Sequence, residues 1–533
     1  MTRKAVYDRL SRIRPTTQSR SRGQRDVFAF LQDPATYGRT EPVIRIDTHG
    51  AAVFLAGPDV YKVKRAVRFP FMDFSTIEKR HAVCEAELVV NRGNAPGLYL
   101  GTVPITRVGD ALHLGGSGEV IEWAVHLRRF DENATLDRLA TNGPFNAELI
   151  DNLARAIVAS HRRAPLRDGG TATRTLRRLL GETVDELGAA ADVFAPGQVI
   201  KFGAALVAGF DKVEPVLLRR GERGQVRRCH GDLHLGNLVL IDDAPVLFDA
   251  LEFDEAFATC DVLYDFGFLL MDLCKRGLRG NANRLFNQYL SMSDDEPLQL
   301  AGLVTLPVFL SFRAAIRAKV LAKLFRLDPG REMLRVEALT YFEAAIGFLT
   351  PVPPQLIAIG GLSGTGKTTL AMAIAPSLGQ APGALHLRSD VERKHRFAVA
   401  ETARLPAGAY QPDLSVLIYN TLDNLAETAL RGGQAVIVDA THLRLGEREA
   451  IAAVAARVGV PFLGLWLEAP TELLVQRVEE RRRDASDATA SVVASQAKQV
   501  IGMLDWHRVD SSQAPDALQF AVLDLLRHAE LRP

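Results

Sequence analysis

Cysteine is scarce in this chain, which contains four among 533 residues. The four are scattered at Cys84, Cys229, Cys260 and Cys274, and no two of them form a CxxC pair. This spacing argues against a disulfide framework and against a zinc site, and it is typical of a protein in a reducing compartment. We therefore expect a cytoplasmic protein.

A surplus of charge of either sign is also absent. The chain has 64 Lys and Arg residues against 63 Asp and Glu residues, which gives a formal net charge of +1. Binding of nucleic acid or a membrane surface through overall charge requires a basic excess. The composition gives no reason to expect either partner, and its 47% hydrophobic and 24% charged residues are typical of an ordinary globular protein.

Long hydrophobic runs are missing as well. The most apolar stretch, residues 303–325, is interrupted by Arg313, Arg317 and Lys319, so we expect no membrane span. Residues 1–25 are rich in Arg and Ser and have no apolar segment, which excludes a secretory signal peptide. A mitochondrial presequence would share this composition, but a basic, disordered tail is the simpler interpretation.

The first half of the chain has the pattern of an α+β domain. Residues 41–67 alternate in short apolar runs with a turn at "AGPD", which predicts a β-hairpin or meander, and residues 76–92 have helical spacing. Strand character returns at "LHLGG" and "EVIEWAVHLRRF", and long Leu- and Ala-rich helical stretches follow. Strands with one early helix, followed by many helices, predict a domain of two lobes.

A proline-rich break, "LTPVPPQ" at 349–355, marks the expected domain boundary. Beyond it, the apolar runs "LIAIGG", "ALHLR", "QAVIVDA" and "VPFLGLWLEA" alternate with helical segments, which predicts a parallel α/β sheet. We therefore predict two domains, at residues 26–350 and 351–533.

The segment "CHGDLHLGNLVL" at 229–240 contains the residue types that a kinase needs. A kinase orients an acceptor hydroxyl, accepts its proton and holds magnesium on the nucleotide phosphates. Asp232 lies in a turn and could accept the proton, and Asn237 offers a neutral oxygen ligand for magnesium. The apolar strand that follows ends at Asp249, which could supply an anionic magnesium ligand.

These residues resemble the catalytic loop and the metal-binding Asp of the aminoglycoside phosphotransferase family. The resemblance implies a protein-kinase-like fold and small-molecule phosphorylation, with His230 holding the geometry of the loop. Asp261 and Asp265 in "CDVLYDFGFLLMDL" also match the family, in which that segment supports the catalytic loop. No G-x-G-x-x-G loop precedes the early strands, and "DAL" replaces D-F-G, which favours small-molecule kinases over protein kinases.

The kinase plan also requires a strand Lys that binds the α- and β-phosphates and pairs with a helix Glu. Lys62 and Lys64 lie on the same face of one strand, since side chains alternate. We favour Lys62, because Val60 two residues earlier would pack near the adenine, and Lys64 is the alternative. Glu87 is the preferred Glu, with Glu85 second.

Acceptor specificity would come from the helical lobe. The stretch "SFRAAIRAKVLAKLF" spaces Arg313 with Arg317, and Lys319 with Lys323, at i,i+4. Such a row could bind an acidic or phosphorylated acceptor, but a solvated helix face has the same pattern.

A second phosphate-binding motif, "GLSGTGKT" at 361–368, satisfies G-x-x-x-x-G-K-[ST] between an apolar strand and a helix-forming run. In that context backbone amides and a helix N-terminus hold the phosphates, the Lys reaches the β- and γ-phosphates, and the Thr ligates magnesium. The predicted nucleotide-binding residues are Gly361, Ser363, Gly364, Thr365, Gly366, Lys367, Thr368 and Thr369, and Thr368 is the predicted magnesium ligand.

Residues after the P-loop suggest the reaction. Asp390 follows the next strand and Arg393 lies one helical turn later, which resembles the D-x-x-R arrangement of P-loop kinases related to gluconate kinase and polynucleotide kinase. The resemblance implies that the Asp faces the acceptor hydroxyl and that the Arg contacts acceptor or phosphate. Asp439, at a strand end, is a Walker-B-like carboxylate near magnesium, and Arg477 and Arg481 are candidates for a lid over the phosphate.

The whole chain resembles a bacterial fusion of an aminoglycoside phosphotransferase-like domain and a P-loop kinase. We predict a bifunctional phosphotransferase that uses ATP and Mg²⁺ on small hydroxylated molecules, with no nucleic acid, membrane or protein partner implied. Two alternatives stay open. The P-loop domain could be a nucleotide-binding regulator of the first kinase, or it could phosphorylate 5′-hydroxyl ends of nucleic acid, which would need a basic groove with aromatic platforms.

Overall fold

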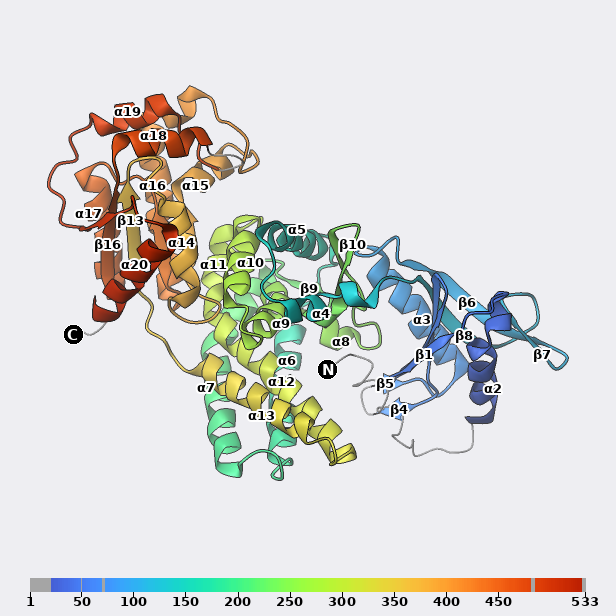
Figure 1. Cartoon of the computed structure of the whole chain (residues 1–533). Coiled ribbons are helices and arrows are strands. Elements are labelled where there is room, and N and C mark those ends of the chain that lie inside the picture. The colour runs from blue at the N-terminus through green and yellow to red at the C-terminus, as the bar shows by residue number, and fades with distance from the viewer. Residues whose placement is uncertain (1–20, 49, 70–71, 481–484, 530–533) are drawn as a thin grey trace. The chain divides into compact units, whose positions relative to one another are not determined.

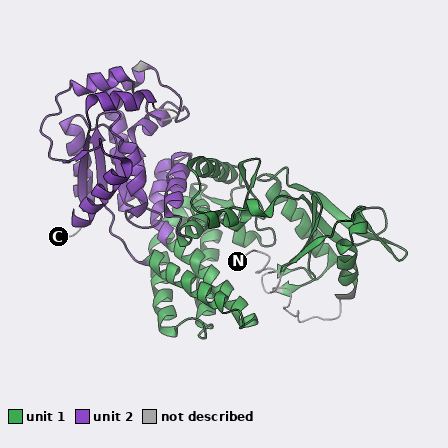
Figure 2. Cartoon of the chain, viewed as in Figure 1, with its two compact units in different colours: residues 1–276, 308–349 green, residues 277–307, 350–533 purple. Residues whose placement is uncertain are grey.

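The structure is a computed structural model that describes residues 21–48, 50–69, 72–480 and 485–529. The chain forms two compact units (Figure 2), which are treated separately below. Unit 1 comprises residues up to Arg276 together with Val308–Leu349, and unit 2 comprises Gly277–Pro307 together with the residues from Thr350 onward.

Unit 1 begins with a lobe built on an antiparallel sheet of six strands in the order β1-β2-β3-β8-β6-β7. Helix α2 (Ser21–Gln32) starts inside the range predicted as a tail; residues 1–20 lie outside the described residues. The alternating apolar runs form the strands as expected, and the predicted early helix is α3 (Ile77–Arg92). The strands are β1 (Ile44–Asp47), β2 (Ala51–Ala56), β3 (Asp59–Lys64), β6 (Tyr99–Val108), β7 (Ala111–Leu114) and β8 (Glu119–Arg128).

Period-two alternation gives this sheet two apolar faces. Phe54 and Val63 pack on one face with residues of α2, whereas Leu55 and Val125 pack on the other with Cys84 of α3. Helix α3 is therefore held against the sheet at the level of β3, which places a helix carboxylate beside the strand lysines.

The second lobe of unit 1 is mainly helical (Figure 1) and also contains two short strand pairs. The pairs are β9 (Val226–Arg228) with β12 (Thr259–Asp261), and β10 (Leu238–Ile241) with β11 (Ala244–Leu247). Two short helices, α4 (Leu136–Leu139) and α8 (Glu255–Ala258), accompany the following long ones: α5 (Ala147–Arg163), α6 (Gly169–Gly188), α7 (Pro196–Glu222), α9 (Val262–Lys275), α12 (Leu306–Leu327) and α13 (Glu332–Leu349). The two-lobed α+β architecture predicted from the sequence is confirmed.

One helical stretch of the described residues, Glu296–Leu327, is long and apolar enough to cross a membrane by length and composition. The sequence analysis expected no such stretch, because three basic residues interrupt the run. Of its most apolar window, 78% is buried inside the protein. This is the behaviour of a core helix, whose apolar side chains pack against neighbouring helices.

Unit 2 contains a parallel sheet of five strands in the order β14-β15-β13-β16-β17. Four strands lie in the predicted apolar runs, and the edge strand β17 was not predicted, because its sequence "HRVD" is mostly polar. The strands are β13 (Leu356–Gly361), β14 (Leu385–Arg388), β15 (Val436–Asp439), β16 (Phe462–Glu468) and β17 (His507–Asp510). The predicted parallel α/β fold is confirmed.

Helices accompany this sheet along the chain, as connections between parallel strands require. After the P-loop they are α14 (Lys367–Ile374), α15 (Ser389–Arg396), α16 (Pro412–Arg431), α17 (Leu445–Val458), α18 (Thr471–Glu480), α19 (Ala490–Ala497) and α20 (Pro515–Ala529).

Two more helices of unit 2, α10 (Arg279–Ser291) and α11 (Glu296–Gly302), come from the range predicted for the first domain. The side chain of Asn283 donates to the carbonyl of Ala384 at 3.0 Å, and Asn287 accepts a hydrogen bond from the backbone amide of His386 at 2.7 Å. These contacts join α10 to the start of β14. The compact units therefore differ from the predicted ranges at 277–307, because a helical pattern does not show which neighbour a helix packs against.

Candidate active sites

The catalytic-loop residues of unit 1 converge where β9, the turn after it and β11 meet. Asn237 donates through Nδ2 to the Asp232 carboxylate and to the Asp232 carbonyl, both at 2.9 Å. Burial alone would raise the pKa of Asp232, but the adjacent His234, together with His230 and Arg317, holds that pKa well below its usual range. The carboxylate is therefore ionised and ready to accept a hydrogen bond from a hydroxyl.

His230 connects Asp232 to the strand end that carries Asp249. Its Nε2 lies 3.0 Å from the carbonyl oxygen of Phe248, and its Nδ1 lies 3.4 Å from the backbone nitrogen of Asp232. Burial lowers the pKa of His230, so the ring is neutral, with Nε2 donating and Nδ1 accepting. This geometry supports the expectation that His230 positions the loop.

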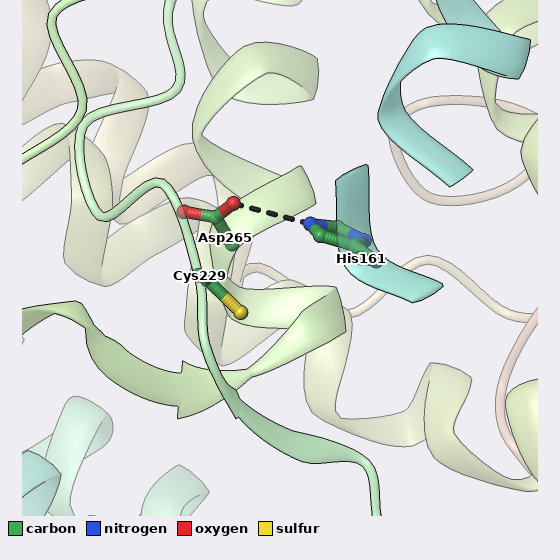
Figure 3. A group of neighbouring side chains, drawn as sticks. All are labelled: His161, Cys229 and Asp265. Atoms are coloured by element: carbon green, nitrogen blue, oxygen red, sulfur yellow. Dashed lines mark hydrogen bonds and ion pairs between the residues drawn. The ribbon is translucent and has the colours of Figure 1, made fainter. Parts of the chain in front are cut away.

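The buried carboxylate of Asp265 holds the backbone of the same loop by hydrogen bonds. Asp265 on α9 accepts hydrogen bonds from the backbone nitrogens of His230 at 3.3 Å and Gly231 at 2.8 Å. Figure 3 shows its remaining partner, His161, at 3.1 Å, with the thiol of Cys229 beside the pair. Because the carboxylate already accepts these three hydrogen bonds, this group is a support for the loop rather than a metal centre. Asp261 has a comparable role: it caps α9 and pairs with Arg220.

Both candidate lysines reach the same glutamate. Lys62 donates to Glu87 at 2.8 Å and to Asp249 at 2.7 Å, whereas Lys64 approaches Glu87 at 2.6 Å and also contacts Glu252. Burial alone would lower the pKa of Lys62, but Asp249 and Glu87 outweigh it and hold the ammonium charged. Lys62 is thus the lysine that joins the helix carboxylate to the predicted metal ligand.

The runner-up Glu85 lies elsewhere: it is exposed and accepts a hydrogen bond from Thr102 at 2.5 Å. Two further residues of this site were not found from the sequence. The hydroxyl of Tyr99 accepts a hydrogen bond from the backbone nitrogen of Asp249 at 3.0 Å, and Asn91 accepts one from Ala250 at 2.8 Å. They hold Asp249 in a left-handed backbone conformation (φ 59°). No local pattern marks residues that act across a fold.

The four basic residues of the predicted row on α12 all line one cleft but have different partners. Arg313 is buried, lies over Tyr264 at 3.9 Å and donates to the carbonyl of Gly231 at 3.2 Å. Lys319 and Lys323 both pair with Glu186. The helix is therefore not a wholly solvated face, and binding of an acidic acceptor by the row stays a prediction.

Arg317 differs from the other basic residues on α12, because its charge is among those that lower the pKa of Asp232 in the cleft. The cleft has a volume of about 2610 Å³, and Lys62, Asn237, Asp249 and Lys275 also line it. The guanidinium of Arg317 lies 5.6 Å from the ring centre of Tyr341, and the ammonium of Lys275 lies 4.3 Å from the same ring. Burial lowers the pKa of Lys275, and the charges of Glu337 and Asp272 offset part of that shift.

In unit 2 the P-loop follows β13 and leads into α14. Gly361, Gly364 and Gly366 have φ values of 134°, 90° and 86°, which residues with a side chain rarely adopt. A Cβ at Gly361 would lie 2.5 Å from the carbonyl oxygen of Leu467, so glycine is also needed for space. Lys367 bends back and donates to the carbonyls of Gly361 at 3.0 Å and Leu362 at 2.9 Å.

Among the remaining P-loop residues, one hydroxyl is directed toward a carboxylate. Thr368 Oγ1 donates to Asp439 at the end of β15 at 2.5 Å. Thr365 closes the loop with a hydrogen bond to the carbonyl of Leu362, Ser363 is buried, and Thr369 is exposed on the first turn of α14. The predicted metal ligands Thr368 and Asp439 are therefore adjacent.

Asp439 is kept ionised by its neighbours. Burial would raise its pKa, but the imidazole of His386 at 3.4 Å, with Lys367 and Arg388, holds that pKa well below its usual range. His386 and Arg388, both on β14, were missed by the sequence analysis. A search for polar residues near the carboxyl ends of all the predicted strands of this sheet would have found them, because parallel strands end at one edge of the sheet.

Asp390 and Arg393 share α15 but have different surroundings. Burial and the nearby charge of Asp439 raise the pKa of Asp390. Arg393 donates to the carbonyl of Ala409 at 2.6 Å and lies over the ring of Tyr410 at 4.8 Å. Its hydrogen bonds therefore hold the segment before α16, and its contact with an acceptor stays a prediction.

The predicted lid is described only in part. Arg477 on α18 donates to the carbonyl of Ser511 at 3.0 Å, and Arg481 lies outside the described residues. Gln496 on α19 was not predicted, although its side-chain oxygen accepts a hydrogen bond from the backbone nitrogen of Ser363 at 2.9 Å. The α18 and α19 region thus contacts the P-loop through Gln496.

Comparisons with known proteins match a separate stretch of the chain to each of two family models. Residues 99–303 match a family model described as "Phosphotransferase enzyme family", and residues 356–501 match one described as "AAA domain". The chain thus carries a phosphotransferase-family domain followed by a P-loop kinase-like domain. The first match includes residues 277–303, which pack in unit 2, so the family domain and the compact unit have different limits.

Full-length relatives share this order. An uncharacterized protein of Mycobacterium tuberculosis strain H37Rv is 29% identical over 484 residues, which are 89% of this chain and 93% of that protein. An uncharacterized protein of Mycobacterium bovis matches to the same extent. Since the alignments span most of both chains, the two domains occur together in these relatives.

Two solved structures resemble one part of the chain each. A choline/ethanolamine kinase family protein from Mesorhizobium loti is 13% identical, with a TM-score of 0.37, and the match covers 62% of this chain and 95% of that one. A gluconokinase from Sinorhizobium meliloti is 19% identical, with a TM-score of 0.24 and coverage of 34% and 95%. Likeness of this degree carries no argument about activity.

Proposed function

We propose that the chain is a bifunctional phosphotransferase that uses ATP and Mg²⁺ to phosphorylate hydroxyl groups of small molecules. The supporting observation is that each unit brings together the same three kinds of group. Each has a lysine for phosphate, a pair of oxygen ligands for magnesium, and a carboxylate for the acceptor. Oxygen ligands of this kind are what Mg²⁺ prefers in proteins.

In unit 1, Asn237 and Asp249 would hold Mg²⁺, which neutralises charge on the nucleotide phosphates when it is bound. Lys62, kept charged by Glu87, would bind phosphate oxygens. Asp232 would orient the acceptor hydroxyl and accept its proton as that oxygen bonds to the γ-phosphorus. A carboxylate with a low pKa suits this role, because proton transfer in phosphoryl transfer occurs late.

In unit 2, Thr368 and Asp439 would hold Mg²⁺, while Lys367 and the P-loop amides would bind the phosphates. Asp390 would orient the acceptor hydroxyl and accept its proton, as Asp232 would in unit 1. Its raised pKa makes it the more basic of the two carboxylates, and the charge of Asp439 beside it is the source of part of that shift. Arg477 and Arg481 stay candidates for closing the site.

The acceptor of unit 1 is proposed to be anionic. Aminoglycosides are polycations and require acceptor clefts lined with uncompensated carboxylates, whereas Arg317 and Lys275 place two cations around Tyr341 in the cleft of Asp232. We expect kanamycin-like compounds to be poor substrates. Strong phosphorylation of kanamycin by the full chain, lost on Asp232→Asn, would contradict this assignment.

The proposal is tested by an ATP-consumption screen of the full chain against sugars, amino sugars, polyols, nucleosides and their phosphorylated forms. The screen uses point variants of the full chain rather than truncated chains, because a chain that begins at residue 351 would lack α10 and α11 of unit 2. Turnover that requires Lys367 and an added acceptor excludes a purely regulatory P-loop domain. If no acceptor raises ATP consumption although the chain binds ATP tightly, the regulatory alternative is favoured. Phosphorylation of DNA or RNA ends would favour the 5′-hydroxyl kinase.

We also propose a cytoplasmic location. All four cysteines are free thiols, as expected in a reducing compartment.

A further inference from the structure

Unit 2 contains a second cluster of ligand-type side chains away from the P-loop. Glu296 on α11 faces Glu392 and His395 on α15, and one ligand atom of each lies within 4.8 Å of the others. The Nδ1 of His395 is 3.6 Å from Glu392 and 3.9 Å from Glu296. The cluster joins the segment 277–307 to the helix that carries Asp390.

The imidazole is oriented by a chain of hydrogen bonds on its other side. The hydroxyl of Ser291 donates to Glu401 at 3.0 Å, and the Nε2 of His395 lies 3.2 Å from the same hydroxyl oxygen. Because the Ser291 proton goes to Glu401, its oxygen accepts from Nε2–H. The Nδ1 atom that faces the two carboxylates therefore has its lone pair available, which is how outer partners orient a histidine ligand.

The carboxylate of Glu392 gives an independent indication of a missing partner. The residue is 7% exposed, and its printed charged partner among the described residues is His395, at 3.6 Å. Two carboxylates that face each other in a largely buried site repel each other. A buried acid of this kind needs a cation or a proton.

We propose that Glu296, Glu392 and His395 bind one divalent transition-metal ion of the Zn²⁺ class. One neutral imidazole and two carboxylates supply a charge of −2 and a mixed N,O ligand set, which suits such an ion better than Mg²⁺. Ligand atoms around tetrahedral zinc lie about 3.3–3.6 Å apart, so the observed spacings need only a small contraction. A cavity of about 200 Å³, lined by Glu296 and Glu392, leaves room for water as a further ligand.

The bound ion would link α11 to α15. Since Asp390 lies one helical turn before Lys394 and His395, the ion would fix the position of the acceptor carboxylate without touching substrate.

The test is isothermal titration of the nucleotide-free full chain with Zn²⁺. We expect one tight site and a rise in the melting temperature of the protein. Glu392→Gln should weaken binding by more than about 100-fold, and Ser291→Ala, which leaves all three ligands in place, by about 10–100-fold.

The matched control is His528→Asn, since His528 forms an exposed pair with Asp524 and pairs with no second carboxylate among the described residues. It should bind Zn²⁺ like the unchanged chain. The proposal is overturned if the unchanged chain binds no Zn²⁺ tightly, or if Glu392→Gln and Ser291→Ala both bind normally. Should Glu392→Gln fail to fold, X-ray absorption of the unchanged Zn²⁺ form decides: nitrogen and oxygen ligands support the site, and sulfur ligands refute it.

Discussion

In unit 1 the nucleotide-site residues are held by one another's charges, whereas in unit 2 they are held by the backbone. Lys62, Glu87 and Asp249 come from a strand, a helix and a distant strand end, and ion pairs connect them. The P-loop residues are consecutive, and glycine backbone conformations fix their shape. The first arrangement should be sensitive to the loss of a charge, and the second to the addition of a Cβ.

The largest difference between the sites should come from Asp232→Asn. The substitution keeps size but removes the ability to accept a proton, so the reaction of unit 1 should fall by about 10²–10⁴. Turnover with the acceptor of unit 2 should be unchanged. Rates with both acceptors measure this, and a parallel loss of both would mean that the two sites are not independent.

Lys367→Ala should have the converse effect. Removing one phosphate contact should lower the unit 2 reaction by about 10²–10³, because the P-loop backbone can still fold. The unit 1 reaction should continue, and only the variant that carries both substitutions should lose all ATP consumption. If Lys367→Ala abolishes the Asp232-dependent reaction in a well-folded chain, the P-loop domain gates unit 1 and two independent kinases is the wrong description.

Gly361→Ala tests whether the backbone itself holds the second site. The new Cβ would lie 2.5 Å from the Leu467 carbonyl oxygen at a φ of 134°, so unit 2 should lose about 1–3 kcal/mol of stability. Nucleotide binding to the P-loop should weaken with it. Gly446→Ala on α17 is the control, since nothing lies within 4 Å of its Cβ position. Equal melting temperatures for the two variants would contradict the conclusion that glycine backbone conformations hold the unit 2 site.

Arg317→Ala should act on acceptor binding in unit 1. Losing a charge-assisted hydrogen bond to an anionic acceptor should raise its KM by about 10–100-fold, with a smaller effect on kcat. Lys323→Ala is the matched control on the same helix, because Glu186 already takes its ammonium group. Steady-state kinetics distinguish them, and a KM that Arg317→Ala does not change would contradict an anionic acceptor.

The smallest expected difference is in pH dependence. Each proposed base works only when ionised, so each rate should fall as pH drops through the pKa of its carboxyl group. Because the pKa of Asp390 is raised and that of Asp232 is lowered, the unit 2 reaction should lose activity first on acidification. Profiles of kcat/KM, with Lys367→Ala isolating unit 1 and Asp232→Asn isolating unit 2, check this. The reverse order would exclude at least one of the two carboxylates as the base.

Residues close together in the sequence could be assigned from the sequence alone. The P-loop, the parallel sheet, and the grouping of Asp232, Asn237 and Asp249 follow from short-range patterns, because turn glycines and strand ends fix the direction of nearby side chains. The order of two kinase-like domains follows from the same motifs.

Only the tertiary structure decided the relations between distant residues. It showed that Lys62 joins Glu87 to Asp249, that Arg313 donates to the carbonyl of Gly231 in the loop, and that α10 and α11 pack with the P-loop unit. Periodicity gives the face of a helix but not the neighbour that covers it. Charge partners and packing partners are set by folding of the whole chain, and no local pattern contains them.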